Sequence, residues 1–126
     1  MILAFLVERI LEFLIKSAYF TPRPYMVNHL PTYVTFIPID SSFPSGHTMT
    51  AFALSTLLFM HNKKLGIICF ILSLLIGAGR VLANVHYPID IISGLIVGVT
   101  IGLLCGKIKL YARRHNPPSR RKKRTN

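Results

Sequence analysis

Apolar residues are gathered in four long segments of the chain, separated by short polar or proline-rich stretches. The segments cover about residues 1–20, 45–62, 65–83 and 88–108. Each is roughly 18 to 21 residues long, close to the ~20 residues that an α-helix needs to cross the hydrocarbon core of a bilayer. The pattern therefore predicts an all-α integral membrane bundle with about four transmembrane helices.

The first segment differs from the others because charged residues interrupt it. Glu8, Glu12 and Lys16 recur every four residues and so share one helical face. The favoured interpretation is that the glutamates pair with Arg9 and Lys16, or that the helix lies at the membrane interface. The alternative is a polar relay or a contact with substrate. The loop that follows, residues 21–44, is rich in proline and aromatic residues and suits the lipid–water interface.

Composition divides the chain into an apolar body and a basic tail. Hydrophobic residues make up 52% and the mean hydropathy is +0.51, yet the formal net charge is +11. Nine of the 15 Lys and Arg residues lie at or after Lys107. We therefore expect one domain over residues 1–110 and a disordered basic tail over residues 111–126. The composition excludes a collagen-like chain and a disulfide scaffold.

The distribution of Lys and Arg predicts how the bundle is oriented. The tail and the two lysines between the second and third segments fall on one side, which the positive-inside rule makes cytoplasmic. The outer side holds the loop of residues 21–44 and the turn of residues 84–87, with only Lys16, Arg23 and Arg80 as basic residues. No aromatic residue interleaves the basic run of the tail, so we expect a topology anchor against anionic lipid and no nucleic-acid partner.

Three groups of polar residues stand at the expected outer ends of the segments. They are Lys16 with Arg23-Pro24, then Pro44-Ser45-Gly46-His47, then Arg80 with His86 and Asp90. The three cations are able to balance the charge of a phosphate group. Ser45 is able to cap the second segment, and the free N–H groups of Gly46 and His47 then point toward the same anion.

The third group also predicts a nucleophile. His86 and Asp90 are four residues apart, within reach of each other if a helix starts near Val85. Asp90 then accepts a hydrogen bond from one imidazole nitrogen and leaves the other as a nucleophile. His47 is a second imidazole, placed to give a proton to a leaving oxygen. The sequence therefore predicts an oxyanion site with a histidine nucleophile.

The order and spacing of these residues resemble the type-2 phosphatidic acid phosphatase superfamily, the membrane branch related to vanadium haloperoxidases. The signatures of that family are Lys-x6-Arg-Pro, Pro-Ser-Gly-His and Ser-Arg-x5-His-x3-Asp, and the resemblance covers about residues 16–106. Gly79 stands where the family usually has Ser, which removes one hydroxyl contact to phosphate. Membrane members usually have about six spans, two of them before the Lys-x6-Arg-Pro helix. The chain therefore resembles the four-helix catalytic core.

The resemblance implies a role for each matching residue. His86 attacks phosphorus and forms a phosphohistidine, Asp90 orients it, and His47 protonates the leaving group and then activates water. The residues implied to hold the phosphoryl oxygens are Lys16, Arg23, Ser45, Gly46 and Arg80. No metal and no other cofactor is implied, and the sequence has no carboxylate cluster of the kind that holds Mg²⁺.

The resemblance also implies a function: a metal-independent phosphatase of lipid phosphates or diphosphates in the bacterial cytoplasmic membrane, with its active site facing outward. Undecaprenyl diphosphate is the first expected substrate, and phosphatidate or phosphatidylglycerol phosphate the second. The expected partners are the lipid substrate and the bilayer, and a homo-oligomer is left open. Two further alternatives are a truncated, inactive membrane fragment or subunit and a vanadate enzyme of the haloperoxidase type.

Overall fold

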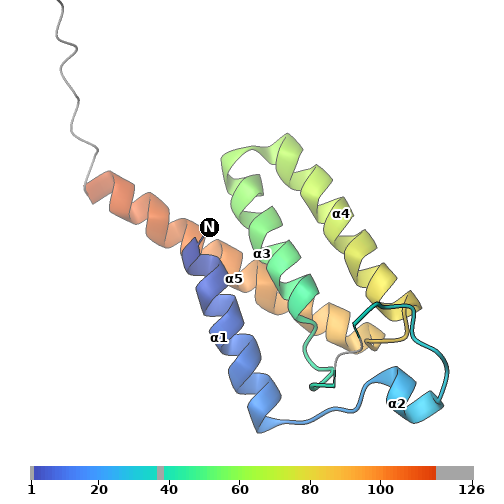
Figure 1. The fold of residues 1–126 in the computed structure, drawn as a ribbon. Coiled ribbons are helices and arrows are strands. Elements are labelled where there is room, and N and C mark those ends of the chain that lie inside the picture. The colour runs from blue at the N-terminus through green and yellow to red at the C-terminus, as the bar shows by residue number, and fades with distance from the viewer. Residues whose placement is uncertain (1, 37–38, 116–126) are drawn as a thin grey trace, which may run out of the picture.

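The computed structural model describes residues 2–36 and 39–115, which form five α-helices (Figure 1). The helices are α1 (Ile2–Ala18), α2 (Pro24–Asn28), α3 (Gly46–His61), α4 (Lys63–Leu82) and α5 (Pro88–His115). The described residues contain no β-strand. The all-α fold expected from the hydrophobic pattern is therefore confirmed.

The helices differ from the expected segments mainly at their ends. Pro24 starts the short helix α2, which the sequence analysis did not anticipate, in the first-turn position that proline favours. Helix α5 continues beyond residue 108 to His115, because good helix formers run on and the first following proline is Pro117. Residues 111–115, expected to belong to a disordered tail, are thus helical. Residues 116–126 of that tail lie outside the described residues.

Two helices are long and apolar enough to cross a membrane, namely α4 and the Pro88–Ala112 part of α5. Helices α1 and α3 have 17 and 16 residues, which is shorter than the expected segments and than the ~20 residues of a full crossing. By this criterion the structure supports two of the four expected spans. The faces of α4 that point away from the bundle are apolar and exposed, for example at Leu75, as lipid-facing surfaces are.

A row of glycines brings α5 against α3. The row consists of Gly94, Gly98, Gly102 and Gly106, one in each turn of α5. A Cβ atom on Gly98 would overlap the carbonyl oxygen of Met49, and one on Gly102 would lie 2.6 Å from the Thr56 Cβ. The two backbones therefore approach as closely as small residues allow, which is a common way for helices to associate in lipid.

Helices α3 and α4 form an antiparallel pair, as the short polar turn between them predicts (Figure 1). Asn62 alone separates them, and its side chain accepts a hydrogen bond from the backbone N–H of Leu65 at 3.2 Å. Farther along, the hydroxyls of Ser55 and Ser73 are 2.9 Å apart. Such pairs satisfy polar groups between helices where no water is present.

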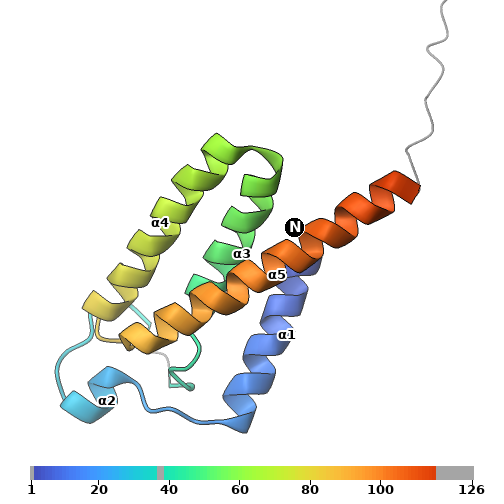
Figure 2. The same ribbon diagram turned by 180° about the vertical axis from the view of Figure 1, so that it is seen from behind.

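One end of the bundle collects the connections that carry the polar motifs. Helices α1 and α4 end there and helices α3 and α5 begin there, with α2 beside them (Figures 1 and 2). Residues that are far apart in the sequence are therefore gathered in one layer. This arrangement sets the position of the candidate site.

The glycine row yields a matched pair of substitutions. We expect Gly98→Ala to lower the free energy of unfolding by about 1–3 kcal/mol, because the new methyl group overlaps backbone atoms of α3. Gly79→Ala makes the same chemical change in α4, where nothing lies within 4 Å of the added Cβ, and should stabilise the helix by up to about 1 kcal/mol. Thermal unfolding in detergent measures both, and equal melting temperatures would contradict close packing at Gly98.

Candidate active site

A buried histidine and carboxylate meet where α4 gives way to α5. His86 lies in the turn before α5 and Asp90 in its first turn, and their side chains are 2% and 1% exposed. The Nδ1 atom of His86 is 3.3 Å from Oδ2 of Asp90. The same oxygen accepts a hydrogen bond from the backbone N–H of Tyr87 at 2.8 Å. The pairing expected from the four-residue spacing is therefore present.

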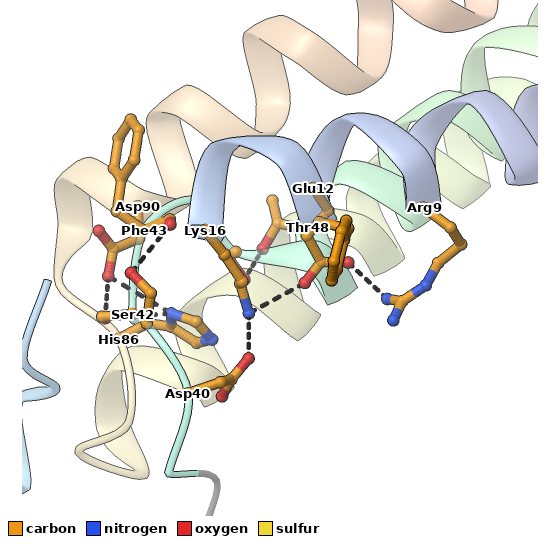
Figure 3. A network of polar contacts seen from close by, with 12 residues as sticks. Arg9, Glu12, Lys16, Asp40, Ser42, Phe43, Thr48, His86 and Asp90 are labelled. Atoms are coloured by element: carbon orange, nitrogen blue, oxygen red, sulfur yellow. Dashed lines mark hydrogen bonds and ion pairs between the residues drawn. The ribbon is translucent and has the colours of Figure 1, made fainter. Parts of the chain in front are cut away.

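Ser42 completes this group, and the sequence analysis missed it. Its hydroxyl donates to Oδ2 of Asp90 at 2.5 Å and lies 3.4 Å from Nδ1 of His86 (Figure 3). Ser42 is held in place because its own N–H donates to the carbonyl of Thr21 at 2.8 Å. Its position two residues before Pro44 was the one available signal, but a serine in a loop is too common to be singled out by type.

Burial lowers the pKa of His86. The hydrogen bond with Asp90 raises that pKa without restoring it, and the nearby charges of Arg23 and Arg80 lower it further. The imidazole is therefore neutral at neutral pH. Because Asp90 accepts from Nδ1, the proton sits on Nδ1 and the lone pair on Nε2.

Arg23 lies across the free nitrogen of this histidine. Its Nη1 is 3.3 Å from Nε2 of His86 and also donates to the carbonyl of Val85 at 2.9 Å. Its Nε and Nη2 donate to the carbonyls of Asp40 and Ser41, at 3.1 and 3.3 Å. The guanidinium is 2% exposed, so these contacts fix a buried cation next to the candidate nucleophile.

Asp40 links the two cations of the first motif, and it too was missed from the sequence. One carboxylate oxygen accepts from Lys16 Nζ and the other from Arg23 Nη2, both at 2.5 Å. Burial raises the pKa of Asp40, but the hydrogen bonds from Lys16 and Arg23 outweigh it and leave the pKa below its usual value. Asp40 is the sole acidic residue between positions 21 and 44, a signal that was available in the sequence.

Glu12 forms the ion pairs that the favoured interpretation expected. It contacts Arg9, and its other oxygen lies 3.0 Å from Lys16 Nζ. Figure 3 shows Lys16 pointing between Glu12 and Asp40. The Glu12 carboxylate also lies at the start of α3, where a Cβ on Gly46 would overlap it. A carboxylate thus occupies the position next to the free N–H groups of that helix.

The second motif lies at the beginning of α3. Ser45 is the N-cap residue, but its side chain makes no capping hydrogen bond, which corrects one expectation. Its hydroxyl instead accepts a hydrogen bond from Thr48 Oγ1 at 3.0 Å, and its N–H donates to the carbonyl of Asp90 at 3.2 Å. His47 is exposed, and it is close enough to Arg80 and His86 to interact with them electrostatically.

Arg80 is the third cation of the site, and its hydrogen bonding differs from that of Lys16 and Arg23. Its side chain is partly buried at the end of α4. The Nε atom is buried and makes no hydrogen bond to any described residue. A donor held in this way is available to an anion that enters the site.

All eight residues expected from the sequence therefore lie at one end of the bundle. A cavity of about 360 Å³ opens beside them, with Lys16 and Asp40 in its wall. A second cavity of about 310 Å³ is lined by Gly46 and His47. A buried histidine–aspartate pair with neighbouring cations is an arrangement that binds an anion and presents a nucleophile to it.

The chain belongs to the PAP2 superfamily, whose family model matches residues 1–114. It is 39% identical over 97 residues to undecaprenyl-diphosphatase BcrC of Bacillus subtilis strain 168, across 75% of this chain and 49% of that protein. The resemblance drawn from the three motifs is thus confirmed.

Two solved structures share the fold. One is the crystal structure of a transmembrane PAP2-type phosphatidylglycerolphosphate phosphatase from Bacillus subtilis, with a TM-score of 0.77 and 25% identity across 91% of this chain and 60% of that one. The other is Aquifex aeolicus LpxE, with a TM-score of 0.75 and 33% identity across 84% and 64%. The likeness to a transmembrane protein, together with the apolar helices, identifies an integral membrane protein. The chain spans about half the length of the BcrC protein that it matches.

The burial of His86 has a measurable consequence. We expect its imidazole to titrate below the ordinary histidine pKa of about 6.5, because burial favours the neutral form. Asp90→Asn should lower the midpoint further, since the carboxylate favours the protonated ring. Nuclear magnetic resonance titration of labelled histidines in detergent measures both, with His86→Gln to assign the signal. A midpoint at or above 6.5 would contradict the burial argument.

Proposed function

We propose that this chain carries the catalytic core of a lipid phosphate phosphatase that acts through a phosphohistidine. The observation that carries the proposal is the buried His86–Asp90 pair, with the free Nε2 of the histidine beside the guanidinium of Arg23. Membership of the PAP2 superfamily supports the same reaction class.

In the first step, Nε2 of His86 attacks phosphorus as a nucleophile. The N–P bond forms while the P–O bond to the leaving group breaks, and the electron pair of that bond stays on the leaving oxygen. His47 gives this oxygen a proton. Asp90 accepts the Nδ1–H hydrogen bond and stabilises the positive charge that develops on the ring of His86.

In the second step, water hydrolyses the phosphohistidine. His47, now neutral, takes a proton from the water as its oxygen bonds to phosphorus. The N–P bond breaks, its electrons return to His86, and inorganic phosphate leaves. The negative charge on the phosphoryl oxygens is balanced by Lys16, Arg23 and Arg80, together with the N–H groups at the start of α3.

Undecaprenyl diphosphate is the substrate that we propose first. The 39% identity to a protein named undecaprenyl-diphosphatase supports this choice. The loop beside the site exposes Tyr33 and Phe36, which suits the level of lipid headgroups. Phosphatidylglycerol phosphate is the second candidate, because the phosphatase from Bacillus subtilis with the same fold is named for it. Phosphatidate is a third, on the resemblance of the motifs alone.

The distribution of Lys and Arg supports an orientation as well. We place the site at the outer face of the bacterial cytoplasmic membrane and the basic tail in the cytoplasm. In this orientation the site meets diphosphate groups in the outer leaflet. The two lysines at the beginning of α4 then lie on the cytoplasmic side with the tail.

The central test is phosphate release from undecaprenyl diphosphate by the purified chain in detergent, with EDTA present. We expect wild type to release phosphate and His86→Ala to lose at least about 10³-fold in kcat, because the nucleophile is absent. Wild type should also incorporate substrate phosphate in an acid-labile, alkali-stable form, and His86→Ala should not.

His61→Ala serves as the matched control, since this exposed histidine lies at the far end of α3 from the site. Its activity should equal that of wild type. Full activity of His86→Ala would refute the mechanism. Absence of release from the folded wild-type chain would instead favour the alternative of an inactive membrane fragment.

Substrate preference needs a separate comparison. We expect kcat/KM for undecaprenyl diphosphate to exceed that for phosphatidylglycerol phosphate and phosphatidate by about tenfold or more, the effect of roughly one additional charge-assisted hydrogen bond to a phosphate that is bonded directly to the departing one. Mixed micelles with each lipid at the same mole fraction provide the measurement. A higher kcat/KM for either of the other lipids would assign the chain to that substrate.

A further inference from the structure

The two cations of the first motif already share an anion. The Asp40 carboxylate holds Lys16 with one oxygen and Arg23 with the other, each at 2.5 Å. These are the side chains that the proposed function assigns to the phosphoryl oxygens. Asp40 therefore occupies the contacts that a phosphate would make.

The need for such an anion follows from the burial of Arg23. Its guanidinium is 2% exposed, and a buried cation without a counter-ion is strongly destabilising. Arg80 lies close enough to Arg23 for their like charges to repel each other, and the charge of Arg80 is attracted by Asp40. An end of the bundle that gathers three cations thus needs a negative charge from the protein itself.

The position of Asp40 makes it exchangeable. Its side chain is 53% exposed, whereas the two cations that it contacts are 2% and 14% exposed. The carboxylate therefore approaches the buried cations from the solvent side, along the wall of the 360 Å³ cavity. Asp40 belongs to a loop, and rotation of its side chain alone would release both cations, so the backbone of the loop need not move.

The contact between Arg23 and His86 is linked to the same ion pair. Arg23 Nη1 lies 3.3 Å from Nε2 of His86, where it is in position to donate to the lone pair that the proposed mechanism uses. The other terminal nitrogen of the guanidinium, Nη2, donates a hydrogen bond to Oδ1 of Asp40. Through this hydrogen bond Asp40 helps to keep Arg23 over the candidate nucleophile.

We propose that Asp40 is the counter-anion of Lys16 and Arg23 and that the phosphate of the substrate displaces it. The inference rests on the proposed function, because it deepens the account of the same phosphate site. A phosphate monoester carries about −1.5 to −2 charge at neutral pH and outcompetes a single carboxylate for two cations. Its arrival draws Arg23 toward the phosphoryl oxygens and frees Nε2 of His86.

The test uses binding of inorganic phosphate to the full chain in detergent, measured by isothermal titration calorimetry at pH 7. We expect Asp40→Asn to bind phosphate about threefold to tenfold more tightly than wild type, the size expected from the loss of two competing ion pairs to a half-exposed carboxylate. Asp40→Glu, which keeps the charge, should bind phosphate much as wild type does.

Glu8→Gln is the control variant. It makes the same change from carboxyl to amide, but Glu8 is buried beside Thr50, and the ion pairs of Lys16 and Arg23 are with Glu12 and Asp40. Its affinity for phosphate should stay within about twofold of wild type. Equal tightening in Glu8→Gln and Asp40→Asn would show an effect that is not specific to Asp40 and would overturn the proposal.

Weaker phosphate binding by Asp40→Asn would also overturn it, because Asp40 would then orient the two cations for phosphate instead of competing with it. Melting temperatures of all variants are measured first, so that a folding defect is not mistaken for either result; if Asp40→Asn is unfolded, Asp40→Ser takes its place. The readout needs no turnover. A chain that binds inorganic phosphate but releases none from lipid substrates would therefore contradict the proposed function, and the binding test of Asp40 would still give its answer.

Discussion

The close approach of α3 and α5 is the contact on which the rest of the site depends. Along the glycine row of α5 the two backbones nearly touch, so the helices cannot slide or rotate without overlap. At the end of this row the N–H of Ser45 donates to the carbonyl of Asp90 at 3.2 Å. The start of α3 is thereby fixed to the start of α5. His47 and His86, which belong to different motifs, are placed at one site by a packing constraint.

The second constraint is electrostatic, and it shapes the segment between α1 and α3. Cations gathered at one end of a bundle repel one another, and burial makes each of them more costly. The structure relieves this with the carboxylates of Glu12 and Asp40, which both contact Lys16. Glu12 has a fixed place on α1 beside Gly46, whereas Asp40 is in a loop and its side chain is half exposed. Of the two, only the loop residue is positioned to respond to an incoming anion.

The sequence predicted the features that depend on regular spacing. A four-residue interval sufficed to pair His86 with Asp90, and apolar runs sufficed to locate four of the five helices. It did not reveal Ser42 or Asp40, because their partners lie 48 and 17 to 24 residues away and depend on the path of a loop. The capping role expected for Ser45 failed for a different, local reason. Its hydroxyl accepts a hydrogen bond from the side chain of Thr48, three residues along the chain, and none from a backbone N–H.

The loop of residues 39–45 has a larger share in the site than its lack of regular structure indicates. Asp40 contacts the cations of the first motif, Ser42 donates to Asp90, and the backbone of Ser45 holds the start of α5. One short stretch thus touches all three motifs. Because α1 and α5 are both attached to it, any shift of this loop moves the cations relative to the histidine. The geometry of the candidate site therefore depends on hydrogen bonds from a few short polar side chains, and not only on the rigidity of the helices.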